Sequence, residues 1–144
     1  MDAELSGEPV PGWRLGAGYT YNENEDPDGA RLSLLTPQHM LKAWTNLRLP
    51  GASNRWQVGG SLHAQSRITG GVCLNEEACG SVRAVQPAYG VLNLRTAFDI
   101  DRNWQLALSV NNVFDKVYYE SIESGLHAWY GAPRNWMLKA EGRF

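Results

Sequence analysis

The sequence predicts an all-β protein whose antiparallel strands run up and down in chain order. Apolar and polar residues alternate along most of the chain, which is the period of a strand with two different faces. Short turns and long connections also alternate strictly, and a tryptophan lies one or two residues after each short turn. These three observations together predict a meander of about six long strands.

Composition excludes some classes of protein and leaves a membrane possible. The chain has 144 residues and a formal net charge of −2, with no basic run, so nothing predicts nucleic-acid binding. No apolar run approaches the ~18 residues that a transmembrane helix needs. A strand crosses a bilayer with about ten residues, of which only alternate ones face lipid. The first residues have neither a basic nor an apolar region typical of a signal peptide.

The first three strands are predicted at residues 13–21, 39–49 and 56–66. In each, every second residue is apolar or small, and most of the residues between them are polar. Met40 and Trp44 interrupt the polar set of the second strand. The apolar sets are Trp13, Leu15, Ala17, Tyr19 and Tyr21, then Leu41, Ala43, Thr45, Leu47 and Leu49, then Trp56, Val58, Gly60, Leu62 and Ala64.

The last three strands are predicted at residues 92–100, 104–111 and 135–144, and a possible short strand at Ala3–Ser6 precedes all six. Met137 is the one apolar residue among the charged and polar positions of the closing strand. The apolar sets are Leu92, Leu94, Thr96, Phe98 and Ile100, then Trp104, Leu106, Leu108 and Val110, then Trp136, Leu138, Ala140, Gly142 and Phe144.

The connections place all short turns at one end of the predicted sheet. In an up-and-down meander, successive connections lie at opposite ends, so strict alternation in length separates the short from the long. This asymmetry is typical of outer-membrane barrels, which have short periplasmic turns and long extracellular loops. The short turns are 9–12, 50–54 and 101–103, and the long connections lie near 22–38, 67–88 and 113–132.

Aromatic residues favour two membrane interfaces, one at each end of the strands. The residues predicted for the short-turn interface are Trp13, Trp56, Trp104 and Phe144, and those for the opposite interface are Tyr19, Tyr21 and Trp136. The alternative is a β-sandwich in solution, whose inner face would carry bulky β-branched residues. Small residues such as Ala17, Ala43 and Gly60 pack a core poorly but cost little against fluid lipid.

Cys73 and Cys79 lie in the long connection 67–88, between glycines and polar residues. A loop-closing disulfide is the favoured interpretation, and it implies an oxidising compartment. Half of a zinc site is the competing interpretation, although it would require closer spacing and a second pair of ligands.

Other chemistry is weakly supported. Asn24, Asp26 and Asp28 resemble the start of a calcium loop, but the bidentate Glu is missing, so we expect a solvated acidic loop. The three histidines have no paired metal-binding spacing, and the G-x-S-x-G pattern of serine hydrolases is absent. We therefore predict neither a metal site nor an enzyme.

Five stretches resemble the C-terminal part of the barrel of TonB-dependent outer-membrane receptors, of the ferric-siderophore type. They are WRLGAGYTYNENED, TPQHMLKAWTNLRLPG, WQVGGSLHAQS, LSVNNVFDKVYYES and YGAPRNWMLKAEGRF, in the expected order. The most specific piece is NNVFDKVYY at 111–119, which is similar to the family's N-x-F-D-x-x-Y signature. YGAPRNW followed by a terminal Phe resembles the family's entry into its last strand.

The resemblance implies a segment of a 22-stranded barrel in the bacterial outer membrane, closed in the family by an N-terminal plug domain. Such receptors import ferric siderophores with energy transmitted through TonB. We therefore expect residues 1–144 to be a C-terminal fragment of the barrel, without the plug, that cannot transport alone. Its expected partners are membrane lipid, the rest of the barrel, the TonB system through the plug, and the ferric siderophore as cargo, with no cofactor. The alternative is a small self-contained barrel or sandwich that binds a ligand or partner in solution.

Contacts with the siderophore are expected at loop tips and in the upper lumen. Arginine and aromatic side chains suit ferric chelates that are anionic or aromatic. The predicted contact residues are Arg67, Tyr119, Trp129, Tyr130 and Arg134.

The signature motif itself is predicted to be structural. Asn112 and Asp115 can satisfy backbone groups where the strand leaves the sheet. We expect Phe114 and Tyr118 to anchor this exit at the membrane surface.

Overall fold

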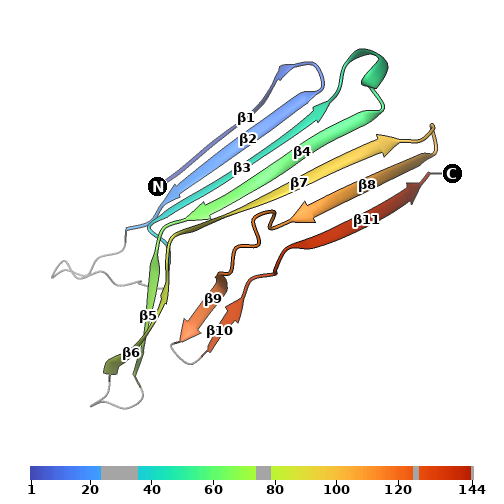
Figure 1. Cartoon of the computed structure of the whole chain (residues 1–144). Coiled ribbons are helices and arrows are strands. Elements are labelled where there is room, and N and C mark those ends of the chain that lie inside the picture. The colour runs from blue at the N-terminus through green and yellow to red at the C-terminus, as the bar shows by residue number, and fades with distance from the viewer. Residues whose placement is uncertain (24–35, 74–78, 125–126, 144) are drawn as a thin grey trace.

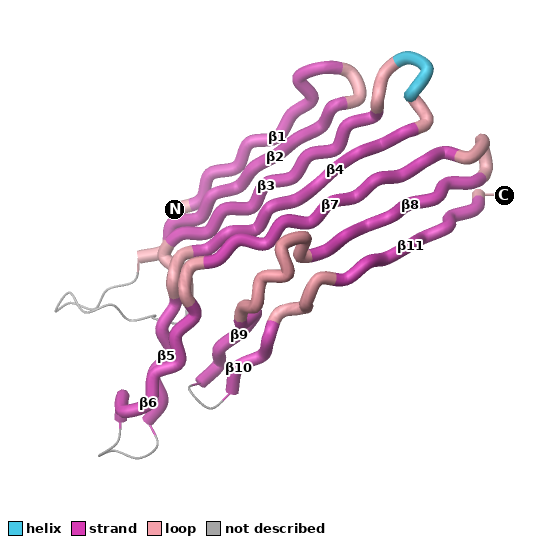
Figure 2. Tube along the Cα trace, viewed as in Figure 1, coloured by secondary structure: helices cyan, strands magenta, loops and turns pink. Residues whose placement is uncertain are grey.

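The computed structural model describes residues 1–23, 36–73, 79–124 and 127–143, and most of these residues lie in β-strands (Figure 2). One 3-10 turn, Gly51–Ser53, lies between β3 and β4. No helix in the described ranges has the length and apolar character to cross a membrane. The strands are β1 Asp2–Val10, β2 Trp13–Tyr21, β3 His39–Arg48, β4 Trp56–Gln65, β5 Ile68–Cys73, β6 Cys79–Gln86, β7 Tyr89–Asp99, β8 Trp104–Asn111, β9 Tyr119–Ser124, β10 His127–Tyr130 and β11 Asn135–Gly142.

Seven strands form one open antiparallel sheet in the order β1-β2-β3-β4-β7-β8-β11. Figure 1 shows a single layer, with the three short turns at one end and the longer excursions at the other. The predicted all-β meander and the separation of its connections are therefore confirmed. β5–β6 and β9–β10 are separate two-stranded hairpins that extend beyond the sheet at the long-connection end.

The short turns have the chemistry that tight turns need. Gly12 and Gly51 adopt positive φ angles of 84° and 66°, which residues with a Cβ rarely adopt. In the third turn, the Asp101 carboxylate accepts the backbone N–H groups of Asn103 and Trp104, each at 2.8 Å. These local interactions fix where each strand restarts and so determine the register of the pair that follows.

The possible short strand at Ala3–Ser6 is a full strand, β1, that pairs with β2. The sequence prediction ended this strand before residues 9–12, which it assigned to a turn, and Pro9 lacks the N–H that a ladder requires. The structure accommodates Pro9 at a register shift between Gly7 and Val10, on an edge strand where no second neighbour needs that N–H.

Two of the predicted long connections also contain strands. The 67–88 segment folds into β5–β6, and β7 begins at Tyr89, three residues before the predicted start. The 113–132 segment contains β9–β10. The two hairpins contact each other, and Ile68, Gln86 and Ile122 are buried in this region. The Gln86 side-chain oxygen accepts the backbone N–H of Tyr119 at 2.6 Å, which ties the hairpins together.

The register places every predicted apolar set of the described strands on one face of the sheet. Directly opposed residues of an antiparallel pair share a face. Ala17 opposes Ala43, and Ala43 opposes Leu62, so the apolar sets of β2, β3 and β4 coincide. The sets of β7, β8 and β11 join them through opposed pairs such as Leu62 and Leu92. We call this the apolar face and its opposite the polar face.

No other part of the described chain covers the apolar face. Leu94 and Leu106 lie on interior strands, yet they are 46% and 38% exposed. In a β-sandwich, such side chains would be buried by a second sheet. The single exposed layer therefore argues against the alternative of a self-contained sandwich.

The polar face carries hydrogen-bonded polar groups together with a few large apolar residues. Arg48 of β3 binds the Asp99 carboxylate of β7 at 2.8 Å, and Gln105 of β8 donates to the same carboxylate at 2.6 Å. The Trp44 indole lies directly over Gly16, where an added Cβ would approach its Nε1 to 2.7 Å. Trp44 thus interrupts the polar pattern because a glycine on the neighbouring strand makes room for it.

Adjacent residues of β11 provide a matched test of the two faces. Leu138 lies on the apolar face and Met137 on the polar face, and they are 68% and 54% exposed. In an assembled barrel in lipid vesicles, we expect Leu138→Lys to lower the free energy of unfolding by about 2–4 kcal/mol, because it places a charge in hydrocarbon. Met137→Lys should change it by less than about 1 kcal/mol. Urea unfolding of both variants measures the difference, and equal losses would contradict the assignment of faces.

Candidate functional site

A polar hollow of about 500 Å³ lies at the long-connection end of the polar face. β4 contributes His63, β7 contributes Tyr89 and Asn93, and the chain after β8 contributes Tyr118 and Glu120. The rings of Tyr89 and Tyr118 stack with their centres 4.5 Å apart, and the His63 ring lies 6.1 Å from that of Tyr89. The hollow therefore combines an aromatic wall with several hydrogen-bonding groups.

Tyr118 is held in this wall by the chain that follows β10. A Cβ on Gly131 would lie inside the Tyr118 ring, so only glycine allows the two segments to approach this closely. The backbone N–H of Gly131 also donates to the Tyr118 carbonyl at 2.9 Å. Burial raises the pKa of the Tyr118 hydroxyl, and the nearby Glu120 carboxylate raises it further. At neutral pH this hydroxyl is therefore protonated and can donate a hydrogen bond into the hollow.

Asn112 supports the floor of the hollow, and its side chain is almost fully buried at 2% exposure. Its Nδ2 donates to the carbonyls of Lys116 and Ala132 at 2.9 and 3.0 Å, and its Oδ1 accepts the Lys116 N–H at 2.8 Å. Asp115 accepts the backbone N–H of Arg134 at 2.9 Å. The predicted role of Asn112 and Asp115 in satisfying backbone groups is confirmed.

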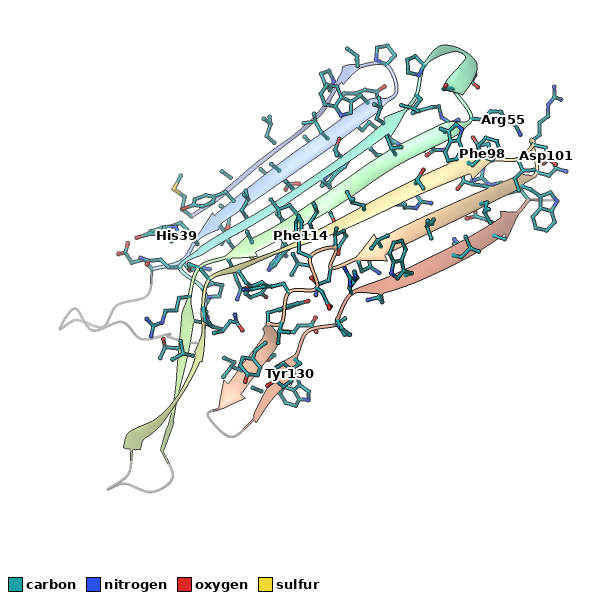
Figure 3. The ribbon with its side chains drawn as sticks, in the orientation of Figure 1. His39, Arg55, Phe98, Asp101, Phe114 and Tyr130 are labelled. Atoms are coloured by element: carbon teal, nitrogen blue, oxygen red, sulfur yellow. The ribbon has the colours of Figure 1, made fainter. Side chains whose placement is uncertain are left out.

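The prediction for Tyr118 as a membrane anchor was wrong, because its ring packs against Tyr89 on the polar face. Asn112 and Asp115 adopt positive φ angles of 51° and 52°, so strand alternation no longer determines where Tyr118 points. Phe114 is 75% exposed, and its role at a membrane surface stays a prediction (Figure 3).

The five predicted contact residues lie around the hairpins at the long-connection end. The structure brings Tyr119 and Tyr130 together as opposed residues of β9 and β10, with their hydroxyl oxygens 3.2 Å apart. Trp129 is the next residue along β10 and is exposed. Arg67 is exposed between β4 and β5, and Arg134 is exposed before β11.

The polar hollow contains His63, Tyr89, Tyr118 and Glu120, which the sequence analysis did not select as ligand contacts. His63 could have been found, because strand alternation already placed it on the polar face near the end of β4. Tyr89 fell at the end of a predicted connection, where no strand pattern indicated its direction.

Comparison with known proteins decides the family. The sequence profile described as TonB dependent receptor-like, beta-barrel matches residues 1–113. The chain belongs to this family. It is 38% identical over 94% of its length to the ferric-pyoverdine 358 receptor of Pseudomonas putida, and 34% identical over 99% to the ferripyoverdine receptor of Pseudomonas aeruginosa. It covers 16% and 17% of the lengths of these two receptors.

Solved receptor structures agree with this assignment. The ferripyoverdine receptor of the Pseudomonas aeruginosa outer membrane, bound to ferripyoverdine, matches 98% of this chain with a TM-score of 0.88 and 34% identity. The match covers 19% of that receptor chain. The catecholate receptor Fiu of Escherichia coli K12 in its closed form has a TM-score of 0.78 and 27% identity, with 98% of this chain and 20% of that chain covered. The described sheet therefore has the geometry of a receptor barrel wall.

The tryptophans after the short turns follow a straight oblique line across this receptor sheet. Trp13 of β2 opposes Leu47 of β3, which in turn opposes Val58 of β4. Two strands away from Trp13, the opposed residue is therefore Val58, two residues from Trp56. In the same way, Trp56 opposes Phe98 of β7, which opposes Leu106 of β8, two residues from Trp104. The line thus shifts by one residue per strand, which corresponds to about 35° at ~3.3 Å per residue and ~4.8 Å per strand. Strands of membrane barrels tilt by about the same angle.

The aromatic residues at the other end follow a nearly parallel line. When opposed residues are followed from Trp136 of β11 across the sheet, five strand pairings lead to Leu15 of β2. Leu15 lies four residues from Tyr19 and six from Tyr21, so this shift is also close to one residue per strand. From Trp13 to Tyr21 the strand rises about 26 Å, or roughly 21 Å along a barrel axis at this tilt. That height approaches the apolar band of membrane barrels, about 25 Å tall.

The cysteines oppose each other in the β5–β6 hairpin, where Cys73 is the register partner of Cys79. Opposed residues of an antiparallel pair have Cα atoms about 4.5–5.5 Å apart, within the range that a disulfide spans. The backbone is therefore compatible with the predicted disulfide, which stays a prediction.

The candidate metal residues gain no support. Asn24, Asp26 and Asp28 lie outside the described residues. His39, labelled in Figure 3, has its Nδ1 2.6 Å from the Tyr19 hydroxyl oxygen, so its ring is already engaged in a hydrogen bond. Within the described ranges, no group of three or more potential ligands could hold a metal ion.

Asn112 should be essential for the stability of the segment that follows β8, and its neighbour Asn111 provides the control. We expect Asn112→Ala to cost about 2–4 kcal/mol, because it removes the buried side chain that pairs three backbone groups of Lys116 and Ala132 and places alanine at positive φ. Asn111→Ala removes only the hydrogen bond to Asn135 and should cost about 1 kcal/mol. Denaturant unfolding of the assembled barrel measures both values. Similar values for the two variants would contradict the role given to Asn112.

The disulfide can be tested by mass spectrometry of the protein from an oxidising compartment. We expect alkylation without reductant to leave Cys73 and Cys79 unlabelled, and alkylation after reduction to label both. Labelling of both residues before reduction would show that the opposed cysteines are not bonded.

Proposed function

We propose that this chain forms part of the wall of an outer-membrane receptor that imports ferric siderophores with energy transmitted by TonB. The apolar face contacts lipid, and the polar face lines the lumen. The observation that carries this proposal is the continuous register of six strands, β2, β3, β4, β7, β8 and β11, which puts most of their polar side chains on one face. Family membership and the similarity to solved receptors support the same function.

The two oblique lines of aromatic residues are the proposed membrane girdles. Trp13, Trp56 and Trp104 mark the periplasmic interface, because they follow the short turns. Tyr19, Tyr21 and Trp136 mark the extracellular interface. Phe144 lies outside the described residues, and Gly142, the last residue of β11, opposes Trp104 of the proposed periplasmic line.

The polar hollow is the proposed contribution of this chain to siderophore binding. It opens at the extracellular end, where a ligand arrives, and it offers the Tyr118 hydroxyl and an aromatic wall. Arg67, Tyr119, Trp129, Tyr130 and Arg134 are proposed further contacts around it. A ferric pyoverdine is the proposed ligand, since relatives named as pyoverdine receptors are 34–38% identical and the catecholate receptors 26%.

A chimeric receptor tests this function. Residues 1–144 would replace the aligned segment of the Pseudomonas aeruginosa ferripyoverdine receptor, in a strain lacking that receptor. We expect the chimera to assemble in the outer membrane and to restore TonB-dependent uptake of radiolabelled ferripyoverdine. An assembled chimera that binds no ferripyoverdine would contradict the proposed ligand, and failure to assemble would contradict the proposed place in the barrel.

Variants of the chimera test the polar hollow separately. Tyr118→Phe keeps the stack on Tyr89 but removes the hydroxyl, and we expect it to weaken ferripyoverdine binding by about five- to tenfold. Tyr19→Phe removes a hydroxyl on the apolar face and should leave the dissociation constant unchanged. Equal binding by both variants and the parent chimera would exclude the Tyr118 hydroxyl as a ligand contact.

A further inference from the structure

We propose that the short-turn end of the apolar face binds one phospholipid of the periplasmic leaflet. Arg55 would hold the lipid phosphodiester, and an apolar hollow beside it would hold an acyl chain. This inference rests on the proposed function, because it takes the apolar face as the surface that contacts lipid.

Arg55 is fixed at the rim of the apolar face. Its guanidinium carbon lies 4.6 Å from the centre of the Phe98 ring, and Phe98 packs against Trp56 with ring centres 4.7 Å apart. Arg55 Nε donates to the Asp99 carbonyl at 2.7 Å, and its Nη2 donates to the Ile100 carbonyl. Figure 3 shows Arg55, Phe98 and Asp101 together at this end of the sheet. The guanidinium is therefore held where lipid headgroups meet the protein.

The charge of Arg55 has no carboxylate partner among the described residues. The Asp99 carboxylate is engaged by Arg48 and Gln105, and the Asp101 carboxylate accepts two backbone N–H groups. Two carbonyls use two of the five N–H donors of Arg55. The remaining donors can bind a phosphate in the bidentate manner that guanidinium favours, and the phosphate would supply the missing negative charge.

An apolar hollow of about 530 Å³ lies farther along the same face. Small residues at Ala43 and Gly60 leave it open, and the Thr45 hydroxyl oxygen on its wall accepts a hydrogen bond from Trp13 Nε1 at 2.9 Å. Val58 on its wall is two residues beyond Trp56, about 7 Å along β4. Apolar residues that line the hollow include Trp13, Leu47, Val58, Leu62, Leu92 and Leu94.

The presence of both Arg55 and the apolar hollow on one face favours a lipid over a free anion. A phosphate at Arg55 lies beside Trp56, a residue type enriched at membrane interfaces. An acyl chain leaving that phosphate would run along β4 toward the apolar hollow. A free phosphate would use Arg55 alone and would be indifferent to the hollow.

The experiment is a lipid titration of the purified chimera, followed by native mass spectrometry in a mild detergent. The probe is dioleoyl phosphatidylglycerol, and glycerophosphoglycerol without acyl chains is the competitor. We expect one tight lipid adduct, which Arg55→Gln weakens at least tenfold because a charge-assisted contact is lost. Ala43→Phe, which fills the apolar hollow, should also weaken it. Arg102→Gln, in the neighbouring turn, should bind like the parent, and the competitor should have no effect.

The opposite results are equally clear. Parent-like binding by Arg55→Gln, or equal weakening by Arg102→Gln, would overturn the specific headgroup site. Displacement of the lipid by glycerophosphoglycerol, or parent-like binding by Ala43→Phe, would show that the acyl chain plays no part. A chimera that assembles and takes up ferripyoverdine but retains no lipid adduct would contradict this inference alone, whereas a chimera that never assembles would contradict the proposed function with it.

Discussion

The backbone register between neighbouring strands is the constraint on which the rest of this structure depends. Side chains alternate with a period of two, so a slip of one residue would move a whole apolar set to the other face. The pairings from β2 to β4, and onward through β7 and β8 to β11, show no slip. The turns at Gly51 and Asp101 support this register locally in the β3–β4 and β7–β8 pairs.

Two functional surfaces follow from the same register. At the long-connection end of the polar face, Tyr89 and Tyr118 build an aromatic wall above the buried Asn112. At the short-turn end of the apolar face, Arg55 lies over Phe98 and beside Trp56. The stagger of the tryptophans agrees with the proposed membrane orientation, because its direction matches the strand tilt of membrane barrels. A single sheet thus has two faces of different chemistry, which the proposed function assigns to the lumen and to lipid.

Sequence reasoning succeeded where alternation is continuous and turns are marked by Gly, Pro, Asn or Asp. It found all of the sheet strands from β2 onward and the end at which the short turns gather. It missed the hairpins β5–β6 and β9–β10, and in β5 consecutive glycines in ITGGVC blur the pattern. It also shortened β1, whose last residues it assigned to the turn 9–12. It misplaced Tyr118, which follows two residues with positive φ angles, Asn112 and Asp115, so that no strand pattern indicates where its side chain points. Contacts such as Gly131 with Tyr118 depend on segments that no local pattern relates.

Accessibility along β8 in a bilayer measures most directly which face meets lipid. Single cysteines carrying a nitroxide would be placed at each residue from Trp104 to Asn111 in the assembled chimera. Collision with oxygen, which dissolves in lipid, would be compared with collision with a water-soluble nickel chelate. We predict a period of two, with oxygen favoured at Leu106, Leu108 and Val110 and the nickel chelate favoured at the residues between them. The opposite phase, or no alternation, would contradict the lipid-facing assignment of the apolar face.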